Sequence, residues 1–393
     1  MTTPLSLTTP TPSQGASDPA QAVHPALQAH IRARIAAAGG WLGFADFMAE
    51  ALYAPGLGYY CNGTPKLGAM PQGLKDGQGV AQGAGSDFVT APELSPLFGK
   101  ALARQVAQAL AQTGTDEVWE FGAGTGALAL QIIEALKEMG VVLRRYRIVD
   151  LSGDLKARQQ ALLAPHAAVV EWVDRLHDTL RGVVVGNEVL DAMPVQLLQR
   201  TGGVWFERGV VWRDGTLAWE DRPTELRPPL EVEGDHDYLT EIHPQGEAFV
   251  RTLGHKLQAG AIFLLDYGYP EAEYYHPQRH MGTVMCHRAH RADPDPLDAV
   301  GLKDITAHVN FTGMAVAAQD AGLEVLGYTA QAHFLMNCGL VQDMQGADLP
   351  VRVAAQKLLM EHEMGELFKV IGFTAGDWWQ AMGFVHGDRT HKL

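Results

Sequence analysis

The residues from Glu120 to Gly126 read EFGAGTG and follow a short apolar run, a pattern that suits contact with a cofactor. Gly122, Gly124 and Gly126 lack the Cβ atoms that would keep a ligand away from the backbone, and glycine permits the positive φ of a tight turn. Because an amphipathic stretch begins directly afterwards, we expect this loop to join a strand to a helix and to bind a ligand through its backbone.

An acidic residue follows at a position that suits recognition of a ribose. Asp150 lies at the predicted end of the next strand, and Leu151 comes directly after it. A carboxylate at that place can accept hydrogen bonds from both hydroxyls of a ribose. The glycine loop and Asp150 together predict a site for a cofactor that contains adenosine, with Leu151 beside it.

Two classes of cofactor fit this pattern. Gly122, Gly124 and Ala127 satisfy the relaxed fingerprint of a dinucleotide site. The carboxylate of Glu120 would repel a pyrophosphate, whereas it would attract the cationic ammonium and sulfonium groups of S-adenosylmethionine. The third glycine, Gly126, also favours the methyl donor. We therefore predict S-adenosylmethionine as the cofactor, and the alternatives are a dinucleotide or glycines that only tighten a contact between a helix and a strand.

A second polar segment follows the predicted strand at 183–185. It contains Asn187, Glu188 and Asp191. Ligands of open parallel sheets lie outside the carboxyl ends of the strands, so these side chains would face the place where a donor methyl group is delivered. Asp266 ends a later predicted strand and occupies the next position along the crevice. The alternative is that Glu188 and Asp191 only begin a surface helix, where acidic side chains favour the helix dipole.

Histidines are concentrated later in the chain. Four of them lie between residues 276 and 290, accompanied by Arg279, Arg288 and Arg291 and with no carboxylate among them. Because these arginines would repel a cation, we predict no metal site and expect a basic loop that contacts or covers the cleft. His308 could accept a proton near neutral pH, and the alternative is a structural hydrogen-bond donor.

The overall composition limits the class of protein. The chain has 393 residues, of which 47% are hydrophobic and 19% charged, and 45 Asp and Glu against 30 Lys and Arg give a net charge of −15. This hydrophobic content supports a sizeable core and excludes disorder of the whole chain. Nucleic acid is a disfavoured partner because surfaces that bind phosphate backbones need clustered Lys and Arg.

Three features predict the compartment. The only cysteines, Cys61, Cys286 and Cys338, are far apart, which suits a reducing environment. No apolar run approaches the roughly 20 residues that span a bilayer, so we predict no membrane insertion. Residues 1–24 are rich in Thr, Pro and Ser and lack Lys and Arg, unlike a signal or transit peptide. We expect a cytoplasmic protein with a flexible tail.

The periodicity of the chain predicts how these residues are positioned. From residue 117 onward, short β-rich runs alternate with helical ones, which indicates an α/β fold with a mostly parallel sheet. We expect a disordered tail at 1–24 and an N-terminal helical region at 25–114 that includes a glycine-rich loop at 61–86. The catalytic core would cover 115–393, with an inserted antiparallel hairpin at 200–230 and cleft-covering loops at 270–312.

Eight motifs occur in an order that resembles the MidA-like family of S-adenosylmethionine-dependent methyltransferases, which includes the mitochondrial complex I assembly factor. The resemblance covers about residues 30 to 373. The motifs are GYY at 58–60, DFVTAPELSPLFG at 87–99, EFGAGTGALA at 120–129, NEVLDAMP at 187–194, LDYG at 265–268, HPQR at 276–279, DITAHVNFT at 304–312 and MGELFK at 364–369.

The resemblance implies a seven-stranded, Rossmann-like class I methyltransferase sheet and, since the mitochondrial member is described as a protein arginine methyltransferase, a protein substrate that could be a respiratory complex subunit. The glycine-rich stretch at 63–85 is longer than the family usually has. Carried over to this chain, the donor-binding residues are Glu120, Gly122, Gly124, Gly126, Asp150, Leu151 and Asn187, and the substrate or lid residues are Tyr59, Asp87, Thr90 and Asn310.

An arginine acceptor needs carboxylates, because a guanidinium stays protonated near neutral pH and is held by bidentate hydrogen bonds. We expect Glu188 and Asp191 to fill that role and His308 or Asp266 to remove the proton. The sequence leaves open a small-molecule or carboxyl methyltransferase, a non-catalytic assembly chaperone that keeps the donor pocket, and a nicotinamide oxidoreductase. It also leaves open a homodimer.

Overall fold

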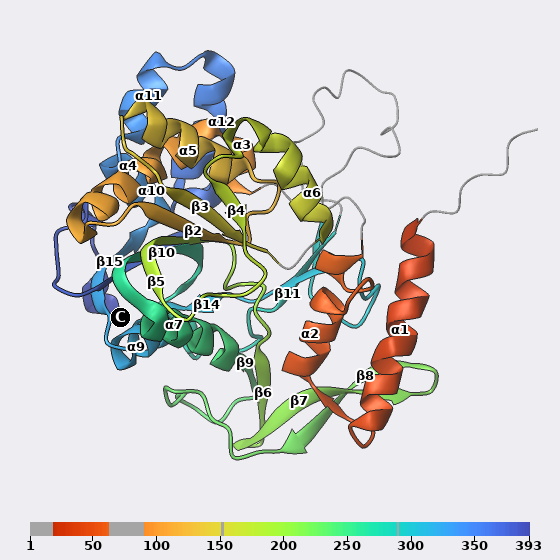
Figure 1. Cartoon of the computed structure of the whole chain (residues 1–393). Helices are drawn as coiled ribbons and strands as arrows, with labels where there is room; N and C mark the ends of the chain where they lie inside the picture. The colour runs from red at the N-terminus through yellow and green to blue at the C-terminus, as the bar shows by residue number, and fades with distance from the viewer. Residues whose placement is uncertain (1–18, 63–89, 151–152, 289–290) are drawn as a thin grey trace, which may run out of the picture.

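The computed structural model describes residues 19–62, 90–150, 153–288 and 291–393 (Figure 1). Its centre is a mixed sheet with the strand order β15-β16-β10-β5-β2-β3-β4, and the short β14 pairs with β10. All these pairings are parallel except those of β16 with β10 and β15. The strands are β2 (Glu117–Phe121), β3 (Arg145–Val149), β4 (Val170–Trp172), β5 (Leu180–Asn187), β10 (Leu257–Tyr269), β14 (Val309–Asn310), β15 (Glu324–Ala330) and β16 (Phe368–Ala375).

This architecture confirms the predicted α/β class with a mostly parallel sheet. Among the described residues the sheet has eight strands rather than the expected seven, because β14 adds two residues beside the end of β10. The helices of this part are α3 (Ala91–Leu94), α4 (Pro96–Thr113), α5 (Ala127–Glu138), α6 (Gly153–Leu162), α7 (Pro244–Lys256), α8 (Glu271–Tyr274), α9 (Phe311–Asp320), α10 (Gln331–Asn337), α11 (Leu340–Gly346) and α12 (Leu349–Leu359).

Alternating side chains of the strands supply two apolar layers, as the pleat of a sheet requires. Phe263 packs with α4, α5, α10 and α12 on one face of the sheet, whereas Ile262 packs with α7 and α9 on the other. Figure 1 shows α4, α5 and α10 on one side of the strands and α7 and α9 on the opposite side. Because α4 belongs to the first of these layers, the structure joins it to the core rather than to the N-terminal helices.

A second sheet lies beside the first and carries the N-terminal helices (Figure 1). The expected hairpin at 200–230 corresponds to β7 and β8, which turn at Asp214 and Gly215, but it belongs to a five-stranded sheet with β1, β6 and β9. Helices α1 and α2 pack on this sheet. The elements are α1 (Pro19–Ala37), β1 (Leu42–Gly43), α2 (Phe44–Tyr53), β6 (Gln196–Thr201), β7 (Val204–Arg213), β8 (Thr216–Pro223) and β9 (Tyr238–Ile242), and a third sheet holds β11 (Met285–Arg288), β12 (Arg291–Asp293) and β13 (Asp304–Thr306).

The first helix begins earlier than the sequence suggested. We expected a tail as far as residue 24, but α1 starts at Pro19 and continues through Pro25. His24 Nδ1 lies 3.1 Å from the carbonyl oxygen of Val300, so the N-terminal half of α1 has a tertiary contact that local sequence preference does not reveal. None of the described helices is long and apolar enough to cross a membrane.

Two facing glycines of the main sheet leave no room for a side chain. Gly182 of β5 pairs with Gly260 of β10, and a Cβ atom added to Gly260 would lie 1.7 Å from the carbonyl oxygen of Gly182. A Cβ atom on Gly182 would lie 2.2 Å from the carbonyl oxygen of Glu117 in β2. Because β2, β5 and β10 pair in parallel, their carboxyl ends come together at one edge.

We predict that Gly260→Ala lowers the free energy of unfolding by more than about 3 kcal/mol, because backbone atoms of neighbouring strands would have to separate. Gly376→Ala is the matched control: Gly376 also has a positive φ, 99°, but its added Cβ atom meets no atom within 4 Å. The free energy of unfolding of this control should fall by only about 1–2 kcal/mol. Urea denaturation followed by circular dichroism measures both, and equal losses would contradict the steric argument.

Candidate functional site

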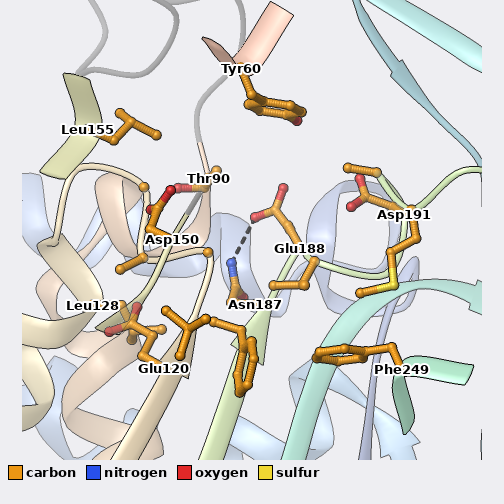
Figure 2. A pocket seen from close by; sticks show the side chains of 18 of the residues that line it. Tyr60, Thr90, Glu120, Leu128, Asp150, Leu155, Asn187, Glu188, Asp191 and Phe249 are labelled. Carbon is orange, nitrogen blue, oxygen red and sulfur yellow. Dashed lines mark hydrogen bonds between the residues drawn. The ribbon is translucent and has the colours of Figure 1, made fainter. Parts of the chain in front are cut away.

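A pocket of about 800 Å³ opens at the carboxyl ends of β2, β3 and β5 (Figure 2). Strand β2 lies between β3 and β5, so the chain reverses its direction of progress through the sheet at this point. Open α/β sheets bind ligands at such a switch point. The lining includes Tyr53, Tyr60, Thr90, Glu93, Glu120, Gly122, Gly124, Thr125, Leu128, Asp150, Leu155, Asn187, Glu188, Asp191, Met193, Phe249 and Asp304.

The glycine loop has the left-handed conformations that its sequence predicts. Gly122, Gly124 and Gly126 have φ values of 63°, 55° and 92°. A Cβ atom on Gly122 would lie 3.2 Å from Cγ2 of Val189. Gly122 and Gly124 line the pocket, whereas Gly126 is the N-cap of α5 and does not appear in the lining. The loop thus exposes backbone to a ligand at its first two glycines.

Glu120 lies at the base of the pocket, at the end of β2. Its Oε2 accepts a hydrogen bond of 2.6 Å from the hydroxyl of Tyr146. Burial raises the pKa of Glu120 to about 8; the charge of Asp150 adds to this rise, and the Tyr146 hydrogen bond opposes it. A buried carboxyl group with a raised pKa gains most from a ligand that brings a positive charge.

Asp150 is held in place by a residue that the sequence analysis did not identify. Gln159 of α6 donates from Nε2 to Asp150 Oδ2 at 2.8 Å and to the carbonyl oxygen of Gly124 at 2.9 Å. Its own Oε1 accepts a 2.9 Å hydrogen bond from Trp172 Nε1. The buried amide of Gln159 therefore ties the predicted ribose carboxylate to the glycine loop.

Glu188 points into the pocket between Asp150 and Asp191 (Figure 2). Its φ is 53°, a left-handed value that is uncommon outside glycine, and its backbone N–H donates to the carbonyl oxygen of Leu265. Asn187 Nδ2 donates to Glu188 Oε1 at 3.1 Å. Burial raises the pKa of Glu188 to about 8, and the charge of Asp191 adds to the rise, while the hydrogen bond from Asn187 opposes it.

Asp191 is buried at the same wall and is supported from β10. The hydroxyl of Tyr267 donates to Asp191 Oδ2 at 2.6 Å. Asp266 accepts the backbone N–H groups of Leu190 and Asp191 on Oδ2, at 2.9 and 3.2 Å, and that of Tyr267 on Oδ1. Burial raises the pKa of Asp191. Asp266 lies beneath the loop and does not line the pocket, so it holds backbone rather than ligand.

Several predicted residues lie elsewhere. His308 packs against Tyr267 and Tyr269, Asn310 caps α9, and Tyr59 is buried beside Tyr60; none of the three lines the pocket. Burial lowers the pKa of His308 to about 4, so this side chain is neutral at pH 7. Leu151 and Asp87 lie outside the described residues, as does most of the predicted loop at 61–86. In the described ranges, no group of three or more His, Cys, Asp or Glu side chains could hold a metal ion.

The structure adds pocket residues that the sequence analysis missed. Tyr60 donates to both carboxylate oxygens of Asp304, at 2.9 and 3.0 Å, and Tyr53 donates to the carbonyl oxygen of Ala192. Tyr60 belongs to the GYY motif, in which the sequence predicts its neighbour Tyr59 as the substrate or lid residue. The hydroxyl of Thr125 donates to Glu93, which ties the glycine loop to α3.

The lining suits cationic ligands. Among the described residues that line the pocket, none is Lys or Arg, and six have carboxyl groups: Glu93, Glu120, Asp150, Glu188, Asp191 and Asp304. S-adenosylmethionine fits this charge, since its sulfonium and ammonium are positive, whereas the pyrophosphate of a dinucleotide would be repelled. The exposed backbone at Gly122 and Gly124 and the anchored Asp150 supply the contacts that its nucleoside part needs.

Comparison with known proteins agrees with this geometry. A model of the family described as "Putative S-adenosyl-L-methionine-dependent methyltransferase" matches residues 101–329, more than half of the chain. The chain belongs to this family, which confirms the predicted class of enzyme and its cofactor, S-adenosylmethionine.

Similar proteins are known at two levels of sequence identity. A crystal structure from Burkholderia thailandensis, bound to S-adenosyl-homocysteine, is 48% identical and superposes with a TM-score of 0.89, covering 99% of this chain and 100% of that one. The mitochondrial protein arginine methyltransferase NDUFAF7 of Danio rerio is 26% identical over 383 residues, covering 86% of this chain and 85% of the relative. The NDUFAF7 of Homo sapiens is 27% identical, covering 75% and 69%.

We predict that Gln159→Leu weakens binding of S-adenosyl-homocysteine about tenfold, because the hydrogen bonds that orient Asp150 and Gly124 are lost. Isothermal titration calorimetry measures the change. Gln105→Leu is the matched control, since Gln105 is equally buried but bonds Gly383 instead of pocket residues. Equal affinities of the two variants would contradict a role of Gln159 in the cofactor site.

We also predict that Glu188→Gln flattens the dependence of thermal stability on pH in the ligand-free protein. The pKa of Glu188 is raised from 4.5 to about 8, so its contribution to stability is complete below pH 4.5 and is lost as the pH rises through 8. The variant should therefore gain stability relative to wild type between pH 5 and 8.5, by a few degrees in Tm. Glu324→Gln, at an exposed position of β15, is the control and should leave the dependence of Tm on pH unchanged. Parallel curves of Tm against pH for Glu188→Gln and wild type would refute the prediction.

Proposed function

We propose that this methyltransferase transfers the methyl group to the guanidinium of a protein arginine. One observation carries the proposal: Glu188 and Asp191 are two neighbouring carboxyl groups, both with raised pKa, in the same pocket as the glycine loop. A guanidinium is planar, always protonated and rich in N–H groups, so it matches a pair of carboxylates better than an ammonium does. Its charge would also stabilise the ionised forms of both groups.

When bound, S-adenosylmethionine supplies an electrophilic methyl group. Glu188 and Asp191 hold the acceptor, and their hydrogen bonds to one side of the guanidinium leave electron density on the nitrogen that attacks. The attacking nitrogen loses one proton as the new N–C bond forms and the C–S bond breaks. Glu188, whose pKa is about 8, suits acceptance of that proton, whereas Asp266 and His308 lie away from the pocket.

The charge of the lining also supports the choice of acceptor. A carboxylate substrate would meet Glu188 and Asp191 with unfavourable charge, so the pocket disfavours a carboxyl methyltransferase. The relatives named protein arginine methyltransferases support an arginine acceptor within a protein. We further propose a respiratory complex subunit as the target, a cytoplasmic location and a homodimer, which affinity capture, fractionation and light scattering would test.

The proposal predicts that Glu188→Gln lowers the rate of methyl transfer at least about 100-fold, because a carboxylate that orients the guanidinium is lost. Binding of S-adenosyl-homocysteine should stay within about threefold of wild type, since a neutral amide of equal size changes little on the donor side. Transfer from a radiolabelled donor to arginine-containing proteins, followed by mass spectrometry of the modified residue, measures the rate.

Glu324→Gln serves as the control for the substitution itself. Unchanged turnover in Glu188→Gln would remove Glu188 from the mechanism. Methylation of lysine or of small molecules, with none of arginine, would overturn the proposed acceptor.

A further inference from the structure

The two oxygens of the Asp191 carboxylate have different surroundings. Oδ2 accepts the 2.6 Å hydrogen bond from Tyr267. Oδ1 is buried and has no hydrogen-bond partner among the described residues, although Asp191 lines the pocket. Buried polar atoms in native proteins nearly always have a partner, so an unpartnered acceptor at a pocket wall indicates a place for a donor from a ligand.

Asn187 shows the same arrangement at the neighbouring position. Its Nδ2 donates to Glu188, while its Oδ1 is buried and has no hydrogen-bond partner in the described ranges. In both side chains one polar atom is occupied by the protein and the other is a buried acceptor without a partner among the described residues. Both residues line the pocket, whose ligand can supply N–H groups.

Tyr267 is itself rigidly placed. Its ring packs edge-on against His308, with ring centres 5.0 Å apart, and against Phe368 at 5.3 Å. Its backbone N–H donates to Asp266, which also binds the backbone of Asp191. Asp266 therefore holds the backbone of Asp191, and the next residue, Tyr267, holds the carboxylate of Asp191.

From this geometry we propose that Tyr267 is a positioning residue: its hydroxyl fixes Oδ2 of Asp191 and so sets the orientation of the carboxylate toward the acceptor. The proposal rests on the proposed arginine acceptor and adds a residue that does not touch the substrate. A hydroxyl that donates to a carboxylate also favours its ionised form, so Tyr267 keeps Asp191 able to bind a cation at lower pH.

The surroundings of Asp191 act in the opposite direction. Titratable groups that interact with it are Glu188 on its own loop, Asp266 and Tyr267 on β10, Tyr53 on α2, and Tyr60. Burial disfavours ionisation of Asp191 and raises its pKa, while the Tyr267 hydrogen bond opposes this rise. Removing only the hydroxyl therefore raises the pKa of Asp191.

The test is Tyr267→Phe, which retains the ring contacts and removes the hydroxyl. With saturating donor and an arginine peptide, kcat/KM should fall about tenfold relative to wild type at pH 6, because one lost hydrogen bond raises the pKa of Asp191 by about one unit. At pH 8.5, where Asp191 is ionised in both proteins, the kcat/KM of the variant should stay within about threefold of the wild-type value. Tyr269→Phe is the matched control, since Tyr269 also packs against His308. The ratio of its kcat/KM to that of wild type should not change with pH. A pH-independent ratio for Tyr267→Phe overturns the inference.

A second measurement does not need the acceptor. Because the hydrogen bond strengthens as Asp191 ionises, the loss of Tm caused by Tyr267→Phe should grow between pH 5 and pH 8.5 in the ligand-free protein. A constant loss overturns the inference. If the wild-type protein methylates no arginine peptide, the proposed function is refuted but the role of Tyr267 is not. The pH dependence of the loss of Tm still decides whether Tyr267 controls Asp191.

If the phenylalanine variant does not fold, 3-fluorotyrosine at position 267 replaces it. Its more acidic hydroxyl is a stronger donor, so the acidic limb of the kcat/KM profile should move to lower pH. An unmoved limb overturns the inference.

Discussion

Burial of carboxyl groups at the carboxyl ends of parallel strands is the constraint on which this site depends. Glu120, Glu188 and Asp191 all have raised pKa values, and in each the first cause is loss of water. An empty pocket of this kind is electrostatically unfavourable, and a positively charged ligand relieves it. The same feature thus favours the cationic methyl donor and supports a cationic acceptor beside it.

The pocket walls come from two parts of the fold. The main sheet supplies the glycine loop, Asp150 and the Glu188 loop, whereas the N-terminal helices and the small third sheet supply Tyr53, Tyr60 and Asp304. In the proposed function the glycine loop and Asp150 contact the donor, whereas the Glu188 loop contacts the acceptor.

Residues outside the pocket lining hold the polar side chains that line the pocket in fixed orientations. Gln159 orients Asp150, Tyr267 orients Asp191, and Asp266 binds the backbone of the loop between them. Each has its polar atoms occupied by protein partners. Such buried networks reduce the freedom of the groups that meet ligand, which is how a site becomes organised before ligand arrives.

The sequence by itself determined the α/β class, the glycine loop, and the presence of Asp150 and of the Asn187 to Asp191 segment at the pocket, because period and glycine spacing are local properties of the chain. Only the tertiary structure decided which way strand-end side chains turn: Asp266 and His308 have suitable chemistry but lie outside the pocket. Tyr60 and Asp304 lie within motifs and Gln159 within none, but their roles arise from contacts between distant segments: Tyr60 contacts Asp304, and Gln159 contacts Gly124. Convergence of that kind depends on packing, which a linear pattern does not encode.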